Sequence, residues 1–74
     1  MPTMKKRNKA RAQRVASTLA HYKYSQLKID EPVEFGDLID LLADIRHYCD
    51  LKNESFFDAD HTAHQHYVAE LEEG

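Results

Sequence analysis

One stretch of this chain, residues 35–50, has an unambiguous helical period, and it limits what the rest of the sequence can fold into. At 100° per residue, its apolar side chains occupy about half of the helical circumference. These side chains are Phe35, Leu38, Ile39, Leu41, Leu42, Ile45, Tyr48 and Cys49. A stripe this wide can cover two neighbouring helices. The sequence therefore predicts an all-α fold with a central amphipathic helix over residues 36–51.

The opposite side of this central helix is polar. It carries four residues that we name the acidic ridge: Asp37, Asp40, Asp44 and His47. Because these positions lie away from the apolar stripe, we expect them to face water. Carboxylates fixed on one helix face attract a cationic partner, so the acidic ridge is a candidate partner-binding surface.

A further helix is expected on each side of the central one. Residues 9–27 follow the i, i+3, i+4, i+7 apolar pattern without Gly or Pro, and Pro32 disfavours helix in the connection that follows. Residues 56–71 follow Ser55, whose Ser-x-x-Asp spacing resembles a capping box. The predicted core of this small three-helix domain is Val15, Leu19, Phe35, Leu38, Leu42, Ile45, Phe56, Ala63 and Tyr67.

The length of 74 residues predicts a single helical domain at 9–74, preceded by a flexible basic N-terminus at 1–8. A chain this short buries only about 60% of the surface that its unfolded form exposes. The central and third helices also carry more apolar surface than a three-helix monomer covers. We therefore expect a symmetric homodimer. Its predicted seam is Tyr48, Phe57, Val68 and Leu71.

Charge is divided unevenly along the chain. Residues 1–28 contain eight Lys or Arg and no acid, whereas residues 29–74 contain thirteen acids and two bases. A basic N-terminal helix is one candidate for binding nucleic acid, since its cations can neutralise phosphates. The candidate contacts are Lys5, Lys6, Arg7, Lys9, Arg11 and Arg14. The alternative is that these cations cover acidic groups of the protein itself.

The sequence favours a cytoplasmic protein. No apolar run approaches the ~20 residues needed to span a membrane, and the N-terminus lacks the apolar core of a signal peptide. The single cysteine, Cys49, cannot form an internal disulfide. Because it lies at the edge of the apolar stripe, we expect Cys49 to be a small buried hydrophobe.

Neither enzymatic activity nor a cofactor is expected. The glycines, Gly36 and Gly74, form no phosphate-binding loop, and His47 and Cys49 lie too far apart around one helix to act as base and nucleophile. His61 and His64, at i and i+3, are weak candidates for a metal-binding helical module. Such a site needs a third and a fourth ligand from elsewhere.

The run Asp37-Leu-Ile-Asp-Leu-Leu-Ala-Asp-Ile-Arg-His-Tyr-Cys-Asp50 and the later Phe56, Ala59, Ala63 and His66-Tyr67 resemble a group of small proteins encoded on bacteriophages, plasmids and integrated elements. The likeness covers about residues 36–70, and this chain departs from the pattern at Asp60, His61 and His64. The group carries no known activity. The resemblance implies a phage or mobile-element origin and action in the cytoplasm of a host cell.

The leading hypothesis is a non-enzymatic protein that binds a host protein through the acidic ridge. Its target would be a host nucleic-acid-handling or defence complex, which it would inhibit in the manner of anti-CRISPR proteins. Nucleic-acid binding by the basic N-terminal helix is the first alternative, and a metal-binding module is the second.

Overall fold

The computed structural model describes residues 4–73, and these residues form three helices and no strand. Helix α1 covers Lys6–His21 and continues into a π-helical turn, η1, at Tyr22–Gln26. Helix α2 covers Phe35–Leu51, and helix α3 covers Phe56–Glu72. The predicted all-α class and the three-helix architecture are confirmed.

The helix boundaries follow local signals in the sequence. The hydroxyl of Ser55 accepts a hydrogen bond from the Asp58 amide at 3.2 Å, so Ser55 caps α3 as predicted. Asn53, with φ of 56°, adopts the left-handed conformation that commonly ends a helix, directly after α2. Helix α1 begins at Lys6 rather than residue 9. The predicted flexible segment at 1–8 is thus helical at 6–8, and its residues 1–3 lie outside the described range.

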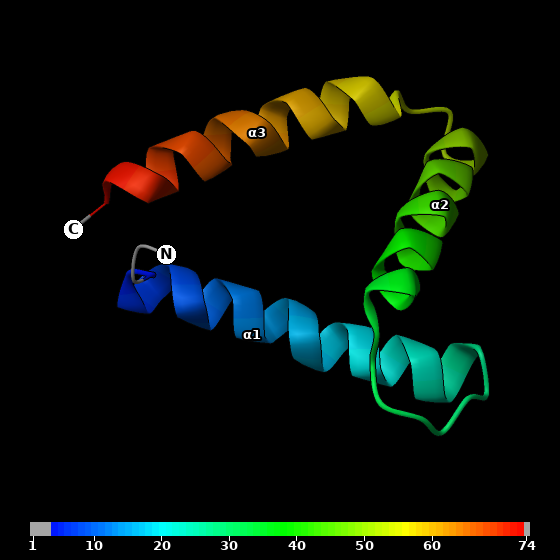
Figure 1. Cartoon of the computed structure of the whole chain (residues 1–74). Coiled ribbons are helices and arrows are strands. Elements are labelled where there is room, and N and C mark those ends of the chain that lie inside the picture. Colours follow the sequence, from blue (N-terminus) through cyan, green and yellow to red (C-terminus); the bar gives the residue numbers. More distant parts are fainter. Residues whose placement is uncertain (1–3, 74) are drawn as a thin grey trace.

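The three helices form the sides of an open frame (Figure 1). We name α1 together with η1 the first helical segment. Helix α2 joins the C-terminal end of this segment to the beginning of α3, and the outer ends of α1 and α3 approach each other again. The radius of gyration is 14.3 Å. A compact domain of this length has a radius of gyration of about 11 Å, so the chain is expanded relative to a packed bundle.

The predicted core is wrong for most of its members. Leu19 is buried as predicted, and Leu38 and Phe56 are half-buried, so the prediction holds in part for these two residues. The other predicted core residues are exposed, Phe35 with 75% and Tyr67 with 57% of its surface accessible. They are Val15, Phe35, Leu42, Ile45, Ala63 and Tyr67. The physical reason is that the helices approach one another near their ends, so the middle of each apolar stripe has no helix across from it (Figure 1).

Cys49 is buried near the C-terminal end of α2, as predicted. Within the part of the chain that is described, no helix combines the length and the apolar character needed to cross a membrane.

Candidate partner-binding surface

The corner between η1 and α2 is built around a buried cation, Lys23, of which 5% is accessible. Its ammonium group, Nζ, donates to the Pro32 carbonyl oxygen at 2.8 Å and to Asp37 Oδ2 at 2.8 Å. Pro32 belongs to the connection and Asp37 to the first turn of α2. A single side chain therefore joins three consecutive parts of the chain.

Asp37 has a second partner, because its Oδ2 also accepts a hydrogen bond from the Glu34 amide at 2.7 Å. Glu34 in turn caps the Asp37 amide, which completes a reciprocal capping box at the beginning of α2. The hydrogen bond from Lys23 and then that from the Glu34 backbone lower the pKa of Asp37. The same bond to Asp37 raises the pKa of Lys23 despite desolvation. Both groups are held in their charged forms at neutral pH.

The backbone between η1 and α2 reverses the direction of the chain. The Leu27 amide donates to the Tyr22 carbonyl at 3.2 Å, closing a wide π-type turn, and the Ile29 amide donates to the Lys23 carbonyl at 3.1 Å. Lys28, between them, has a φ of 61° in the left-handed region. These bonds fix the path by which the connection leaves the first helical segment and passes Lys23.

A second contact at this corner joins Tyr22 to α2, because the Tyr22 hydroxyl donates a hydrogen bond to Asp44. The prediction that the acidic ridge faces water is therefore wrong for Asp37 and needs correction for Asp44, which is exposed but bonded to Tyr22. Asp40 and His47 face solvent as predicted. The helix is rotated so that part of its polar side, not the middle of its apolar stripe, approaches the first helical segment.

Exposed carboxylates surround the buried ion pair. We name them the acidic corner; they are Asp30, Glu31, Glu34, Asp40 and Asp44, and all five are exposed. Two of them, Glu31 and Glu34, lie near enough to Lys23 to contribute to its raised pKa through their charge. Because Lys23 and Asp37 neutralise each other, the five carboxylates give the surface outside the pair a net negative charge, although the exposed Lys28 lies beside Asp30.

The corner between α2 and α3 uses a different interaction. The Arg46 guanidinium lies 4.4 Å from the ring centre of Phe56 and 5.7 Å from that of Phe57. Such cation–π contacts join the end of α2 to the beginning of α3. Phe57 and the other residues of the predicted dimer seam, Tyr48, Val68 and Leu71, are all exposed in the single chain.

The outer ends of the frame meet through Arg11. Its Nε lies 3.0 Å from Glu70 Oε2, and its Nη2 lies 3.1 Å from Glu73 Oε2. Asn8 also donates to the Glu70 carbonyl oxygen at 3.1 Å. One of the six predicted nucleic-acid contacts is therefore engaged with the protein's own acids. The other five are exposed: Lys5, Lys6, Arg7, Lys9 and Arg14.

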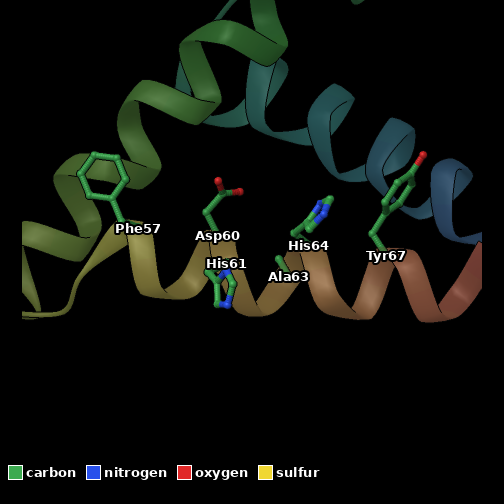
Figure 2. A pocket seen from close by; sticks show the side chains of 6 residues that line it. All are labelled: Phe57, Asp60, His61, Ala63, His64 and Tyr67. Atoms are coloured by element: carbon green, nitrogen blue, oxygen red, sulfur yellow. The ribbon is translucent and has the colours of Figure 1, made fainter.

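The candidate metal-binding histidines lie along α3. Figure 2 shows that Asp60, His64 and Tyr67 extend from one side of the helix, whereas His61 extends from another. His61 lies next to Gln65, with 3.4 Å between His61 Nε2 and Gln65 Nε2. Among residues 4–73, no three His, Cys, Asp or Glu side chains are grouped so that they could hold a metal ion.

Comparisons with known proteins supply no relative: the chain matches no protein-family model, no curated protein and no solved structure.

Sequence reasoning did not single out Lys23, although this side chain positions the acidic corner. Lys23 did leave a signal. It lies four residues after Leu19 and therefore on the apolar side of the first helix, where an unpaired charge is costly. A lysine at this position is stable when an acidic side chain pairs with it. The partner, Asp37, is 14 residues away in the sequence, and no local spacing identified it.

Proposed function

We propose that this protein is a non-enzymatic binding protein whose acidic corner docks on a cationic surface of a partner protein. The observation that carries the proposal is the group of five exposed carboxylates around the buried Lys23–Asp37 pair. Like charges at this density repel one another, so displaying them together on folded backbone costs free energy that other contacts must offset.

The buried pair supplies such contacts. Lys23 holds the connection through Pro32 and holds α2 through Asp37, so Glu31, Glu34 and Asp40 are displayed from fixed backbone. A preorganised charged surface loses less conformational entropy on binding than a mobile one. Its charge also accelerates the encounter with an oppositely charged partner.

A cationic groove that handles nucleic acid offers the complementary charge. The resemblance of residues 36–70 to proteins of phages and mobile elements supports a host complex of this kind as the target. We therefore propose a host nucleic-acid-handling or defence complex, inhibited by occupation of its cationic groove.

The test is affinity capture from a bacterial host lysate treated with nuclease. The corner variant carries Asp30→Lys and Asp40→Lys, and the matched control carries Asp50→Lys and Glu54→Lys. These four acids are exposed, and none makes a side-chain hydrogen bond or ion pair with another described residue. Both variants change the net charge equally, from −3 to +1.

We expect a host protein that the wild type and the control variant capture and the corner variant does not. An equal loss of capture by both variants would mean that net charge, not the acidic corner, determines binding, and undiminished capture by both would exclude the acidic corner. Capture of nothing by the wild type would contradict the proposal.

Nucleic-acid binding is a second candidate, favoured by the exposed cations of α1. Arg7 and Arg14 lie on one flank of the helix, and neither pairs with an acid among residues 4–73. Replacing both by Ala should weaken binding and reduce its salt dependence by about one unit of slope per lost phosphate contact. Lys28→Ala with Lys52→Ala is the matched control. Equal effects of the two pairs would exclude a site on α1.

A further inference from the structure

The described frame leaves more surface accessible than a folded chain of its size normally does. The accessible area is 6527 Å², whereas a compact 8.6 kDa monomer exposes roughly 4,700 Å². The excess is about 1,800 Å² per chain. Large apolar side chains on all three helices contribute to it, including Val15, Ile39 and Tyr67.

Part of this surface is a groove between α1 and α3, which we name the terminal groove. It has a volume of 560 Å³. Its lining includes Ala12 and Val15 from α1 and Tyr67 and Leu71 from α3, while Arg11 and Glu70 lie at the contact that brings the two helices together. Figure 2 shows Tyr67 extending from the same side of α3 as His64 and Asp60. An apolar groove with charged groups at its margin has the composition of a protein interface.

The two helices beside the terminal groove carry opposite charge. Helix α1 contains five Lys or Arg and no acid, and α3 contains four acids and no Lys or Arg. Within the chain, Arg11 already pairs with Glu70, which shows that the two helices are compatible neighbours. Lys6, Arg7, Lys9 and Arg14 on α1, and Asp60 and Glu72 on α3, remain without an ion pair among residues 4–73.

We infer that a second copy of this chain occupies the open face of the frame, forming a twofold dimer in which α1 of each copy lies against α3 of its partner. A twofold axis makes the two contacts identical, so each basic helix meets an acidic one. Covering the excess on both copies buries roughly 3,600 Å² in total, which lies in the range of obligate homodimers. Val15, Tyr67 and Leu71 then become part of a shared core.

The dimer does not involve the acidic corner, so the test of the dimer is independent of the test of the proposed partner. The test uses two variants, each with the charge of one helix reversed, first separately and then mixed. One variant carries Arg7→Glu and Arg14→Glu, and the other carries Asp60→Lys and Glu72→Lys. Arg11 and Glu70 are kept in both, so the contact within each chain is preserved.

The wild type, free of nucleic acid, should sediment as a dimer at micromolar concentration. Each variant alone places like charges across both contacts and should dissociate at least tenfold more readily. An equimolar mixture restores opposite charges at both contacts, and native mass spectrometry should then show the mixed dimer in preference to either homodimer. Circular dichroism on each variant establishes that its helices are retained.

A second pair of variants, each of which places one carboxylate at an apolar position, tests the apolar part of the interface. Leu71→Glu should dissociate the dimer, whereas Leu51→Glu, an equally drastic change at an exposed position outside the terminal groove, should not. A wild type that is monomeric at 100 µM would overturn the inference, and so would a mixture of charge variants that forms no mixed dimer.

Discussion

The two ends of the first helical segment are attached to the rest of the chain by ion pairs of different kinds. At one end Lys23 and Asp37 are almost enclosed, with 6% and 12% of their side chains accessible. At the other end Arg11 meets Glu70 with 29% and 32% accessible, and Glu73 is more exposed still. The enclosed pair is bonded to the Pro32 carbonyl and the Glu34 amide, whereas the exposed pairs are open to solvent.

This difference predicts different contributions to stability. Exposed ion pairs are screened by water and salt and contribute at most about 1 kcal/mol. When a pair is enclosed, removing one partner leaves the other poorly solvated, so the loss is larger than the attraction alone suggests. The corner at η1 and α2 should therefore be the persistent part of the frame, and the α1–α3 end should open first.

The largest effect is expected from Leu19→Ala, because Leu19 is the most buried apolar side chain of the described core, with 5% accessible. It lies one helical turn before Lys23. The substitution should cost about 2–5 kcal/mol of unfolding free energy, measured by urea denaturation. Val15→Ala, at a half-exposed position on the same helix, should cost less in a monomeric background. An equal cost for both would mean that the persistent corner is not centred on Leu19.

The next effect is expected from Lys23→Met, which keeps the apolar part of the side chain and removes its charge. The Pro32 carbonyl then loses a donor, and Asp37 keeps only the Glu34 amide. The melting temperature should fall. The double variant with Asp37→Asn should fall by less than the two single losses added together, because the partners act as one unit. Additive losses would show that the two groups do not interact in solution.

The enclosed pair also predicts a dependence on pH. The pKa of Asp37 is lowered in the folded chain from its ordinary value of 3.8. Its stabilising contribution is therefore complete above pH 3.8 and is lost as the pH falls through the lowered pKa. The pKa of Lys23 is raised from its ordinary value of 10.5, so its contribution is complete below pH 10.5 and is lost as the pH rises through the raised pKa. The difference in melting temperature between wild type and Asp37→Asn should hence be constant from pH 5 to 9. A difference that shrinks within this window would contradict the assignment.

The smallest effect is expected from Arg11→Ala at the exposed end. It should cost at most about 1 kcal/mol, and 0.5 M salt should remove most of that cost. Hydrogen exchange should nevertheless increase near the C-terminal end of α3, because Glu70 and Glu73 lose their contact with α1. Lys6→Ala, at an exposed position with no ion pair among residues 4–73, is the control and should change neither quantity.

Local chemistry accounts for what could be predicted of the fold. The 3.6-residue period placed the central and third helices within one residue of their observed ends, because α2 and α3 are stabilised by bonds between residues three or four apart. Ser55 and Pro32 marked boundaries for similarly local reasons. The beginning of α1 was missed because no capping side chain marks Lys5.

The candidate site was predictable only in its composition. Asp40 was correctly assigned to an exposed acidic surface, and Asp44 is exposed but bonded to Tyr22. Asp37 was wrongly assigned, because its partner Lys23 comes from another element. Periodicity reports which side chains share a face of a helix, but not which neighbour that face meets. For the same reason it could not identify Arg46 as the contact of Phe56.

The sequence by itself thus determined three helices, the limits of α2 and α3, and the separation of basic from acidic segments, since each depends on neighbours along the chain. Only the tertiary structure decided that Lys23 is buried, that α2 turns part of its polar side toward Tyr22, and that Leu42 and Tyr67 are exposed. Those outcomes depend on how the connections orient whole helices. Rotating a helix about its axis changes every contact across it while leaving its internal hydrogen bonds the same.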